Sequence, residues 1–397
     1  MADRGRASGR AVVALCLLLL FALVGCDQKP ATDTAKSEVQ RVLDLRATAI
    51  LDRNEPGFVR TGALSWFGNL AAVPLADWSY RLTDLDRTGD TATAEAVLSY
   101  RVRGYDTAPV TVGRTLNLSL DAGGQWYVDT ERPAQQAAEQ LWDQGEVMAV
   151  RGAHGLVLGV GQSAAALRSY ADLADRAVPA VSEAWGTDWS RRVVVLVPKS
   201  LEGMAGLLGS PASSYRGIAA VTTGETGAPA LAPADRIIVN PDAYGVLGAF
   251  GKQVVLTHET THVATRADTT PATPLWLSEG YADWVGYRGT GRTPSQAAPE
   301  LSQAATEGKL PAALPSDPDF GFGSDASGLA RAYESGWMAC RMIADRWGEV
   351  RLGEFYQAVG AHEERAGAVE DAMAKVLGTT PGEFTEQWRE YLRAQLG

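Results

Sequence analysis

The segment that most constrains this chain is His258-Glu259-x-x-His262, which holds two of its four histidines. Residues 252–257 before it contain no proline or glycine, so a helix is expected here. On a helix, side chains four residues apart lie on one face, one turn apart. Two neutral imidazoles so placed can bind one Zn²⁺, and Glu259 can take a proton from a water on that metal. Because short patterns of this kind also occur by chance, the segment alone leaves a metal site and a plain helix open.

A second expected helix supplies a third ligand, which catalytic zinc commonly needs beside an open position for water. Residues 274–285 open at a proline, which a first helical turn tolerates. They contain Glu279, seventeen residues after His262. Its apolar neighbours indicate that it points inward, where a buried carboxylate needs a partner such as a metal. Asp283, one turn later, is expected to accept the second ring N–H of one of the two histidines.

Together these two segments resemble the gluzincin metallopeptidases of the thermolysin and aminopeptidase N type. The matching residues are His258-Glu259-x-x-His262 and Trp276-Leu277-x-Glu279-Gly280-x-Ala282. The resemblance implies that His258, His262 and Glu279 bind one zinc ion. It also implies that Glu259 is the general base and that Asp283 supports a histidine ligand, as an aspartate does in thermolysin.

Tyr333 stands where members of this family carry a tyrosine on a later helix. The resemblance implies that its hydroxyl stabilises the oxyanion of the tetrahedral intermediate, a role that suits a phenol aimed at developing negative charge. The alternative is an ordinary amphipathic residue with its ring in the core and its hydroxyl in water. The sequence leaves both open.

The segment before the zinc motif bears on the substrate. Aminopeptidase N relatives carry a Gly-x-Met-Glu-Asn run that binds the substrate amino terminus, and residues 215–250 contain no such run. Instead, residues 217–221 and 236–240 predict two short strands. A strand beside the zinc helix could pair with an extended peptide, which favours an endopeptidase or a narrow processing enzyme.

The amino terminus predicts export. Three arginines precede an apolar run at residues 11–24, which is too short for a transmembrane helix and fits a signal peptide over residues 1–25. Residues 23–26 resemble the lipobox of bacterial lipoproteins, in which Cys26 is diacylated and becomes the first mature residue. Two acyl chains would hold the protein on the extracytoplasmic face of a bacterial cell membrane. An uncleaved anchor and an ordinary secretory signal are the alternatives.

Charge and cysteine content fit this assignment. The formal net charge is -11, and it becomes -13 without residues 1–25, which hold three arginines and one aspartate. Such a chain lacks the basic footprint of a nucleic-acid-binding protein. Of three cysteines, Cys16 leaves with the signal and Cys26 is lipidated, so no intramolecular disulfide is expected. Cys340 is expected to be an inert core residue, and His154 and His362 are expected to be ordinary residues.

The mature chain is too long for one ordinary domain, and two domains are expected. After a polar tether at residues 26–34, residues 35–133 predict a long helix and then alternating β-strands, with a hairpin signal at 121–124. This order resembles the cone-shaped α+β fold of nuclear-transport-factor-like and SnoaL-like domains. The region contains no histidine, so we interpret it as a spacer or recognition module.

Residues 135–397 are expected to form the gluzincin-like domain. Its α/β part, residues 135–290, should combine a mixed sheet with the zinc helix. Strands are predicted at 155–159 and 192–197 and a helix from Ala164 to Trp185. Residues 291–397 should form a helical lobe, with three helices that begin at Leu329 and are separated near Gly348 and Gly378. A loop beyond Glu300, ending near Asp325, either covers the cleft or simply connects.

The predicted fold class is therefore α+β, and the predicted function is a membrane-anchored, extracytoplasmic zinc metallopeptidase that hydrolyses peptide bonds in peptide or protein substrates. Two alternatives remain. The zinc lobe could bind without cutting, as part of a surface scaffold or recognition lipoprotein, or the enzyme could hydrolyse a non-peptide amide of the cell envelope.

Overall fold

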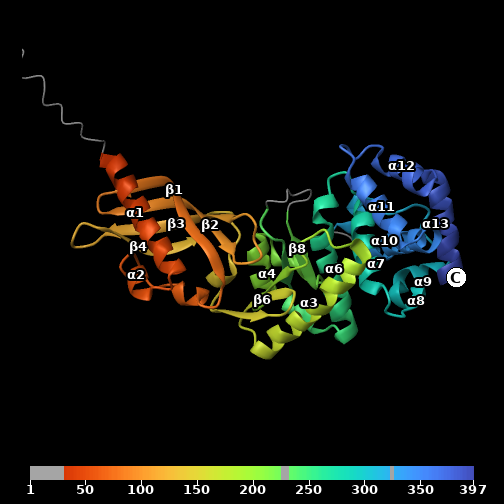
Figure 1. The fold of residues 1–397 in the computed structure, drawn as a ribbon, viewed down its shortest axis with the longest axis horizontal. Helices are drawn as coiled ribbons and strands as arrows, with labels where there is room; N and C mark the ends of the chain where they lie inside the picture. The colour runs from red at the N-terminus through yellow and green to blue at the C-terminus, as the bar shows by residue number, and fades with distance from the viewer. Residues whose placement is uncertain (1–30, 225–231, 322–325) are drawn as a thin grey trace, which may run out of the picture.

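The computed structural model describes residues 31–224, 232–321 and 326–397 and shows a mixed α+β protein with two sheets (Figure 1). The predicted signal peptide and the lipidated Cys26 lie outside these residues. Among the described residues, no helix combines the length and the apolar character needed to cross a membrane.

The first domain is a long helix packed on a four-stranded antiparallel sheet (Figure 1). Its elements are α1 (Ala31–Leu51), α2 (Glu55–Val59), η1 (Phe67–Leu70), β1 (Leu75–Thr88), β2 (Thr91–Val102), β3 (Val110–Leu120) and β4 (Trp126–Pro133). Side chains along β2 alternate between the core and the surface, which confirms the predicted strand. The predicted hairpin is confirmed at Asp121, whose Oδ1 accepts hydrogen bonds from the backbone of Gly123 and Gln125 at 2.8 and 2.9 Å.

The predicted tether at residues 26–34 is wrong at its carboxyl end, because α1 already begins at Ala31. Ala35 is buried in the first domain's core, and Ser37 donates its hydroxyl to the carbonyl of Thr34. The polar residues at this end of the helix lack the apolar periodicity that marks the rest of α1, so the pattern placed the helix start too late.

Buried charges connect the first domain to the chain that follows it. Glu131 accepts hydrogen bonds from Nε of Arg46 and of Arg114, both at 3.2 Å, and from the hydroxyl of Tyr80 at 3.0 Å. Arg114 also makes a bidentate pair with Asp143 at 2.9 Å. Two guanidinium groups and two carboxylates balance in charge, as burial requires. Because Asp143 lies beyond β4, the network fixes the exit of the chain from the first domain.

The second sheet has the order β5-β6-β7-β9-β8, with β6, β7 and β9 parallel and β5 and β8 antiparallel at its edges. The elements of this part are η2 (Leu141–Asp143), β5 (Val147–Arg151), β6 (Gly155–Val160), α3 (Ala164–Trp185), β7 (Val193–Val197), α4 (Leu201–Leu208), η3 (Ala212–Tyr215), β8 (Ala220–Thr223) and β9 (Arg236–Val239). The predicted strands at 155–159 and 192–197 and the helix from Ala164 to Trp185 are confirmed.

The two sheets share one hydrophobic core across the boundary that was predicted near residue 133. The rings of Trp78 and Trp142 lie 5.3 Å apart, and the same buried cluster contains Leu158 and Ile238 from the second sheet. Burying these residues together stabilises the contact between the two parts. The change at residue 133 is therefore a change of sheet within a continuous core.

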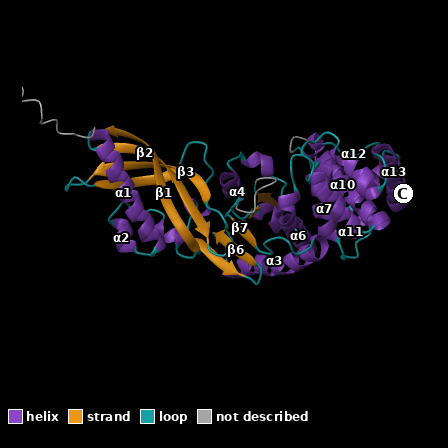
Figure 2. Cartoon of the chain, turned by 45° about the horizontal axis from the view of Figure 1, so that its top comes forward, coloured by secondary structure: helices purple, strands orange, loops and turns teal. Residues whose placement is uncertain are grey.

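Helices make up the rest of the chain and gather at its carboxyl-terminal end (Figure 2). They are α5 (Pro241–Gly245), α6 (Ala249–Thr265), η4 (Arg266–Asp268), α7 (Leu275–Tyr287), α8 (Pro294–Ala297), α9 (Pro299–Thr306), η5 (Asp317–Phe320), α10 (Ala326–Trp347), α11 (Glu349–Gly360), α12 (Ala368–Ala372), the π-helix η6 (Met373–Leu377) and α13 (Pro381–Leu396). The predicted loop beyond Glu300 is partly wrong, since α9 and η5 lie within it. The single helix predicted between Gly348 and Gly378 is also wrong, because α11 ends at Gly360 and α12 begins only after Gly367, where φ is +81°.

Helices α7 and α10 cross at very short range, and this crossing sets the position of Glu279. A Cβ on Gly280 would lie 2.3 Å from the carbonyl oxygen of Gly336. Neither position therefore has room for a side chain, and the two backbones approach as closely as glycine permits. The contact holds the start of α7 against α10, which carries Tyr333.

Candidate metal centre

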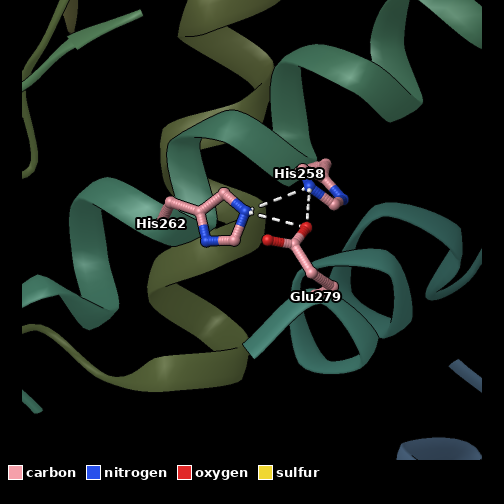
Figure 3. A group of neighbouring side chains, drawn as sticks. All are labelled: His258, His262 and Glu279. Atoms are coloured by element: carbon pink, nitrogen blue, oxygen red, sulfur yellow. Dashed lines mark hydrogen bonds and ion pairs between the residues drawn. The ribbon is translucent and has the colours of Figure 1, made fainter. Parts of the chain in front are cut away.

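Two adjacent helices bring the three predicted ligands together (Figure 3). His258 and His262 project from one face of α6, and Glu279 points toward both imidazoles from α7. The Nε2 atoms of the two histidines are 3.0 Å apart, and Oε2 of Glu279 lies 3.2 Å from the first and 3.4 Å from the second. Within the described residues, these three form the group of ligand-type side chains that could hold a metal ion.

This spacing fits a zinc ion. Zinc in proteins is usually tetrahedral with ligands at about 2.0–2.1 Å, which places neighbouring ligand atoms about 3.3 Å apart. The three observed separations bracket that value. Two imidazole nitrogens and one carboxylate form a donor set that zinc prefers, and three protein ligands are the usual number at a catalytic site.

Asp283 contacts His258. The sequence had left open whether its partner is His258 or His262. Its Oδ1 lies 2.8 Å from Nδ1 of His258, so the ring donates this N–H and turns the lone pair of Nε2 toward the site. Burial lowers the pKa of His258, but Asp283 and Glu279 outweigh it and raise that pKa well above its ordinary value. For Glu279, burial raises the pKa, and the two histidines more than reverse this and lower it strongly.

Replacing Asp283 with Ala is expected to weaken zinc binding by about 10–100-fold, because His258 would lose the acceptor that fixes its ring. Competition titration with a zinc chelator measures the change. The control is Asp371→Ala, which removes the exposed carboxylate beside His362 and should leave zinc affinity unaltered. Equal affinities of Asp283→Ala and wild type would contradict this role.

Glu259 is buried beside the candidate ligands, and its carboxylate has a partner that the sequence did not reveal. The hydroxyl of Thr222 donates to Oε2 of Glu259 at 2.6 Å. Thr222 belongs to β8, the edge strand next to α6. The strand predicted at 217–221 is wrong at both ends, because β8 covers Ala220–Thr223. Had the predicted strand extended to Thr223, it would have included Thr222. A threonine in a strand beside the zinc-motif helix is the pattern that could have indicated a partner for Glu259.

Tyr333, on α10, lies near the candidate ligands. Its ring centroid is 6.5 Å from that of His258, and Phe320 packs edge-on against it at 5.2 Å. Burial, together with the charges of Glu279, Asp283 and Glu259, raises the pKa of Tyr333 well above its ordinary value. The phenol is therefore protonated at neutral pH and available as a hydrogen-bond donor.

A cleft passes over these residues and has two sides that meet at His258, Glu259 and Tyr333. The larger cavity, about 600 Å³, we call the Leu329 side; its further lining includes Ile218, Val254, Val255, Tyr287 and Leu329. The smaller cavity, about 270 Å³, we call the Arg266 side; its further lining includes His262, Arg266, Thr269, Thr270, Thr273, Ser278 and Glu279. Both sides combine apolar walls with polar groups: Arg216 lines the first side, and Arg266 and several hydroxyl groups line the second.

The loop beyond Glu300 was predicted either to cover the cleft or simply to connect, and one of its described residues contacts the cleft wall. Phe320, at the end of η5, is buried against Tyr333. The last residues of that predicted loop, 322–325, lie outside the described residues. The contact of Phe320 shows that this connection packs on the cleft wall.

The remaining sequence candidates lie elsewhere. His154 contacts the carbonyl of Arg191, and His362 contacts Asp371 and the carbonyl of Glu364, so neither joins the ligand group. Cys340 is fully buried, and burial raises the pKa of its thiol well above the ordinary value. A thiol in that state is a poor nucleophile.

Glu334, next to Tyr333, carries a pH-dependent contribution to stability. It accepts backbone hydrogen bonds from Glu300 and Leu301 at 3.2 and 2.7 Å. Burial raises its pKa to about 7, although these hydrogen bonds oppose the shift. An acid with a raised folded pKa stabilises the fold below its unfolded pKa, and this stability is lost as pH rises through the folded value.

Glu334→Gln is neutral at every pH and should remove this loss. The Tm of the variant minus that of wild type is expected to increase between pH 5 and pH 8. Thermal unfolding at several pH values, with zinc saturating throughout, measures it. A difference that stays constant, or decreases toward pH 8, would contradict the raised pKa.

Comparison with known proteins gives no family assignment. No family profile matches this chain, and no curated protein is significantly similar to it in sequence.

Proposed function

We propose that this protein is a zinc metallopeptidase of the gluzincin type, which hydrolyses peptide bonds. The observation that carries the proposal is the convergence of three ligand atoms at zinc spacing, with the buried carboxylate of Glu259 on the helix that carries the two histidines. The helical region after residue 291 would be the second lobe of a gluzincin-like domain, and the cleft would be its substrate site.

The chain's own residues account for the required proton transfers. A zinc ion bound by His258, His262 and Glu279 would supply Lewis acidity, which acidifies water and polarises a carbonyl group. Glu259 would take the proton of the attacking water and return it to the leaving amine. Tyr333 would donate its hydroxyl to the oxyanion, which its protonated state and its place at the junction of the cleft support.

Edge strand β8 supports a peptide as the substrate. It pairs with β9 on one side, and Val221 and Thr222 line the Arg266 side of the cleft. An extended peptide could add to such an edge through main-chain hydrogen bonds. An endopeptidase or a narrow processing enzyme fits this arrangement, since the amino-terminus-binding run of aminopeptidase N relatives is missing.

We propose that the enzyme acts outside the cytoplasmic membrane of a bacterium, held there by lipid on Cys26. The support is the sequence pattern of residues 1–26. The first domain, which resembles nuclear-transport-factor-like domains, would act as a spacer or recognition module between the anchor and the catalytic part.

Turnover of a broad peptide library by the zinc-loaded chain from residue 27 onward tests the proposal. Cleavage that a chelator abolishes and added zinc restores is the expected result. Stoichiometric zinc without cleavage would favour the scaffold alternative. Release of products from peptidoglycan fragments, with no peptide cut, would favour the envelope amidase.

Thr222 is expected to hold the carboxylate of Glu259 in the orientation that proton transfer needs. Thr222→Val keeps the shape of the side chain and removes the hydroxyl, and kcat should decrease by about tenfold, consistent with the loss of a charge-assisted hydrogen bond. Thr222→Ser keeps the donor and should restore most of kcat. Steady-state kinetics on one library peptide measures both variants, and equal kcat values for Val and Ser would contradict the role.

A further inference from the structure

Arg266 stands out on the wall of the cleft. It follows α6 directly, one turn after the ligand His262, and it lines the Arg266 side together with His262 and Glu279. Its side chain is only 16% exposed. A guanidinium this close to a metal centre is a strong candidate for contact with substrate.

A buried partner fixes Arg266 but leaves part of it available. Nε of Arg266 donates to Oδ2 of Asp235 at 2.8 Å. Asp235 lines a separate cavity near the domain boundary, whereas Arg266 lines the metal cleft. The carboxylate therefore binds the guanidinium from the side away from the cleft. Among the contacts between described residues, this pair uses only Nε, and Arg has four further N–H donors.

Two of the hydroxyl groups that line this side with Arg266 already have partners in the protein. The hydroxyl of Thr269 is 2.7 Å from that of Tyr356, and Thr270 donates to the carbonyl of Gly360 at 3.0 Å. Because its guanidinium is permanently charged, Arg266 is the strongest hydrogen-bond donor among the described residues on this side of the cleft. With a volume of about 270 Å³, the cavity has room for a short acidic group.

We propose that Arg266 binds a carboxylate of the substrate and thereby makes the enzyme selective for an acidic group near the scissile bond. This inference rests on the proposed peptidase function and adds its substrate class. A guanidinium matches a carboxylate through two parallel hydrogen bonds, and Asp235 holds it in the orientation that such a pair requires. The carboxylate belongs either to an Asp or Glu side chain or to the free carboxyl terminus of the peptide.

Matched peptides test the selectivity. One set carries Glu or Gln at each position in turn around the scissile bond, with both ends blocked by acetyl and amide groups. A second set keeps Gln and has either a free or an amidated carboxyl terminus. At one position, or at the free terminus, kcat/KM is expected to be about 10–100-fold higher for the charged form.

Variants assign this preference to Arg266. Removing Arg266 alone would leave Asp235 buried without a partner, so the main variant is the pair Arg266→Met with Asp235→Asn, and its zinc content and Tm check folding. The charged-to-neutral ratio is expected to fall to about 1 in this pair. It should be intermediate in Arg266→Lys, which keeps the charge but loses the planar fork, and it should remain in Asp235→Asn.

Two results would overturn the inference: a wild-type ratio near 1 at every position, or a ratio that survives in the double variant. Binding of the same blocked peptides to the zinc-loaded wild type, measured by calorimetry, separates this failure from failure of the proposed function. If no peptide is cut, tighter binding of the charged peptide, lost in the double variant, still supports the carboxylate site. Equal dissociation constants for the charged and neutral peptides would reject it.

Discussion

Glu259→Gln is expected to reduce kcat by about 10²–10⁴-fold, the range that general acid–base catalysis contributes, while zinc binding is retained. The amide has the size of the carboxylate, and its oxygen can still accept the hydroxyl of Thr222, which lies 2.6 Å from Oε2. The packing of this buried side chain should therefore persist. What is lost is the ability to accept a proton from water at neutral pH.

Peptide turnover and zinc content should be measured on the same preparations of wild type and Glu259→Gln. A matched control is Glu386→Gln, the same change on the exposed face of α13, which should retain full activity. Loss of zinc together with activity would show that the variant perturbs the site, and Glu259→Asp would then be the second test. Wild-type turnover in the zinc-loaded Gln variant would refute a catalytic role for Glu259.

Glu279→Gln is expected to lower zinc affinity by more than about 100-fold. Loss of a supporting residue such as Asp283 costs about 10–100-fold, and loss of a ligand should cost more. The variant removes the negative ligand that lies 3.2 and 3.4 Å from the two imidazole nitrogens. A metal that binds only the folded protein stabilises it, and this stabilisation grows with the logarithm of the zinc concentration divided by Kd. Because Kd is larger in the variant, most of the zinc-dependent rise in Tm should be lost.

Chelator competition gives the affinities, and thermal unfolding with and without zinc gives the stabilisation. Glu334→Gln, on the neighbouring helix α10, is the control and should keep the zinc-dependent rise at pH 6, where the wild-type carboxyl group is largely protonated. A Glu279→Gln variant that binds zinc as tightly as wild type would exclude Glu279 from the metal centre.

The cluster of candidate ligands could be predicted from the sequence because each part of it is local. The spacing of His258 and His262 places both on one helical face whatever the rest of the fold is. Glu279 and Asp283 lie one turn apart in a segment whose apolar residues predict a helix with Glu279 on its inward face. The structure places all four side chains together at α6 and α7.

Residues that reach the site from distant parts of the chain could not be predicted in the same way. Thr222 meets Glu259 only because β8 pairs with β9 and lies along α6, and a strand shifted by two or three residues changes which side chain faces the helix. The pair of Arg266 with Asp235 likewise depends on the loop before β9. Local periodicity carries no information on such contacts.

The same reason explains the errors in the fold. The core that Trp142 and Ile238 share with the first domain is a long-range property, which the local change of pattern near residue 133 could not predict. The turn at Gly367 interrupts a stretch whose amphipathic pattern continues on both sides. Helix ends and domain contacts are set by tertiary packing more than by propensity.

Activity measured during a zinc titration tests the central claim most directly. Metal-free protein is titrated with zinc, and hydrolysis of one library peptide is followed together with zinc binding. Hydrolysis is expected to be absent without metal and to increase linearly until one zinc is bound per chain. Hydrolysis by the metal-free chain, or no hydrolysis of any library peptide at full zinc occupancy, would contradict the assignment of a zinc peptidase.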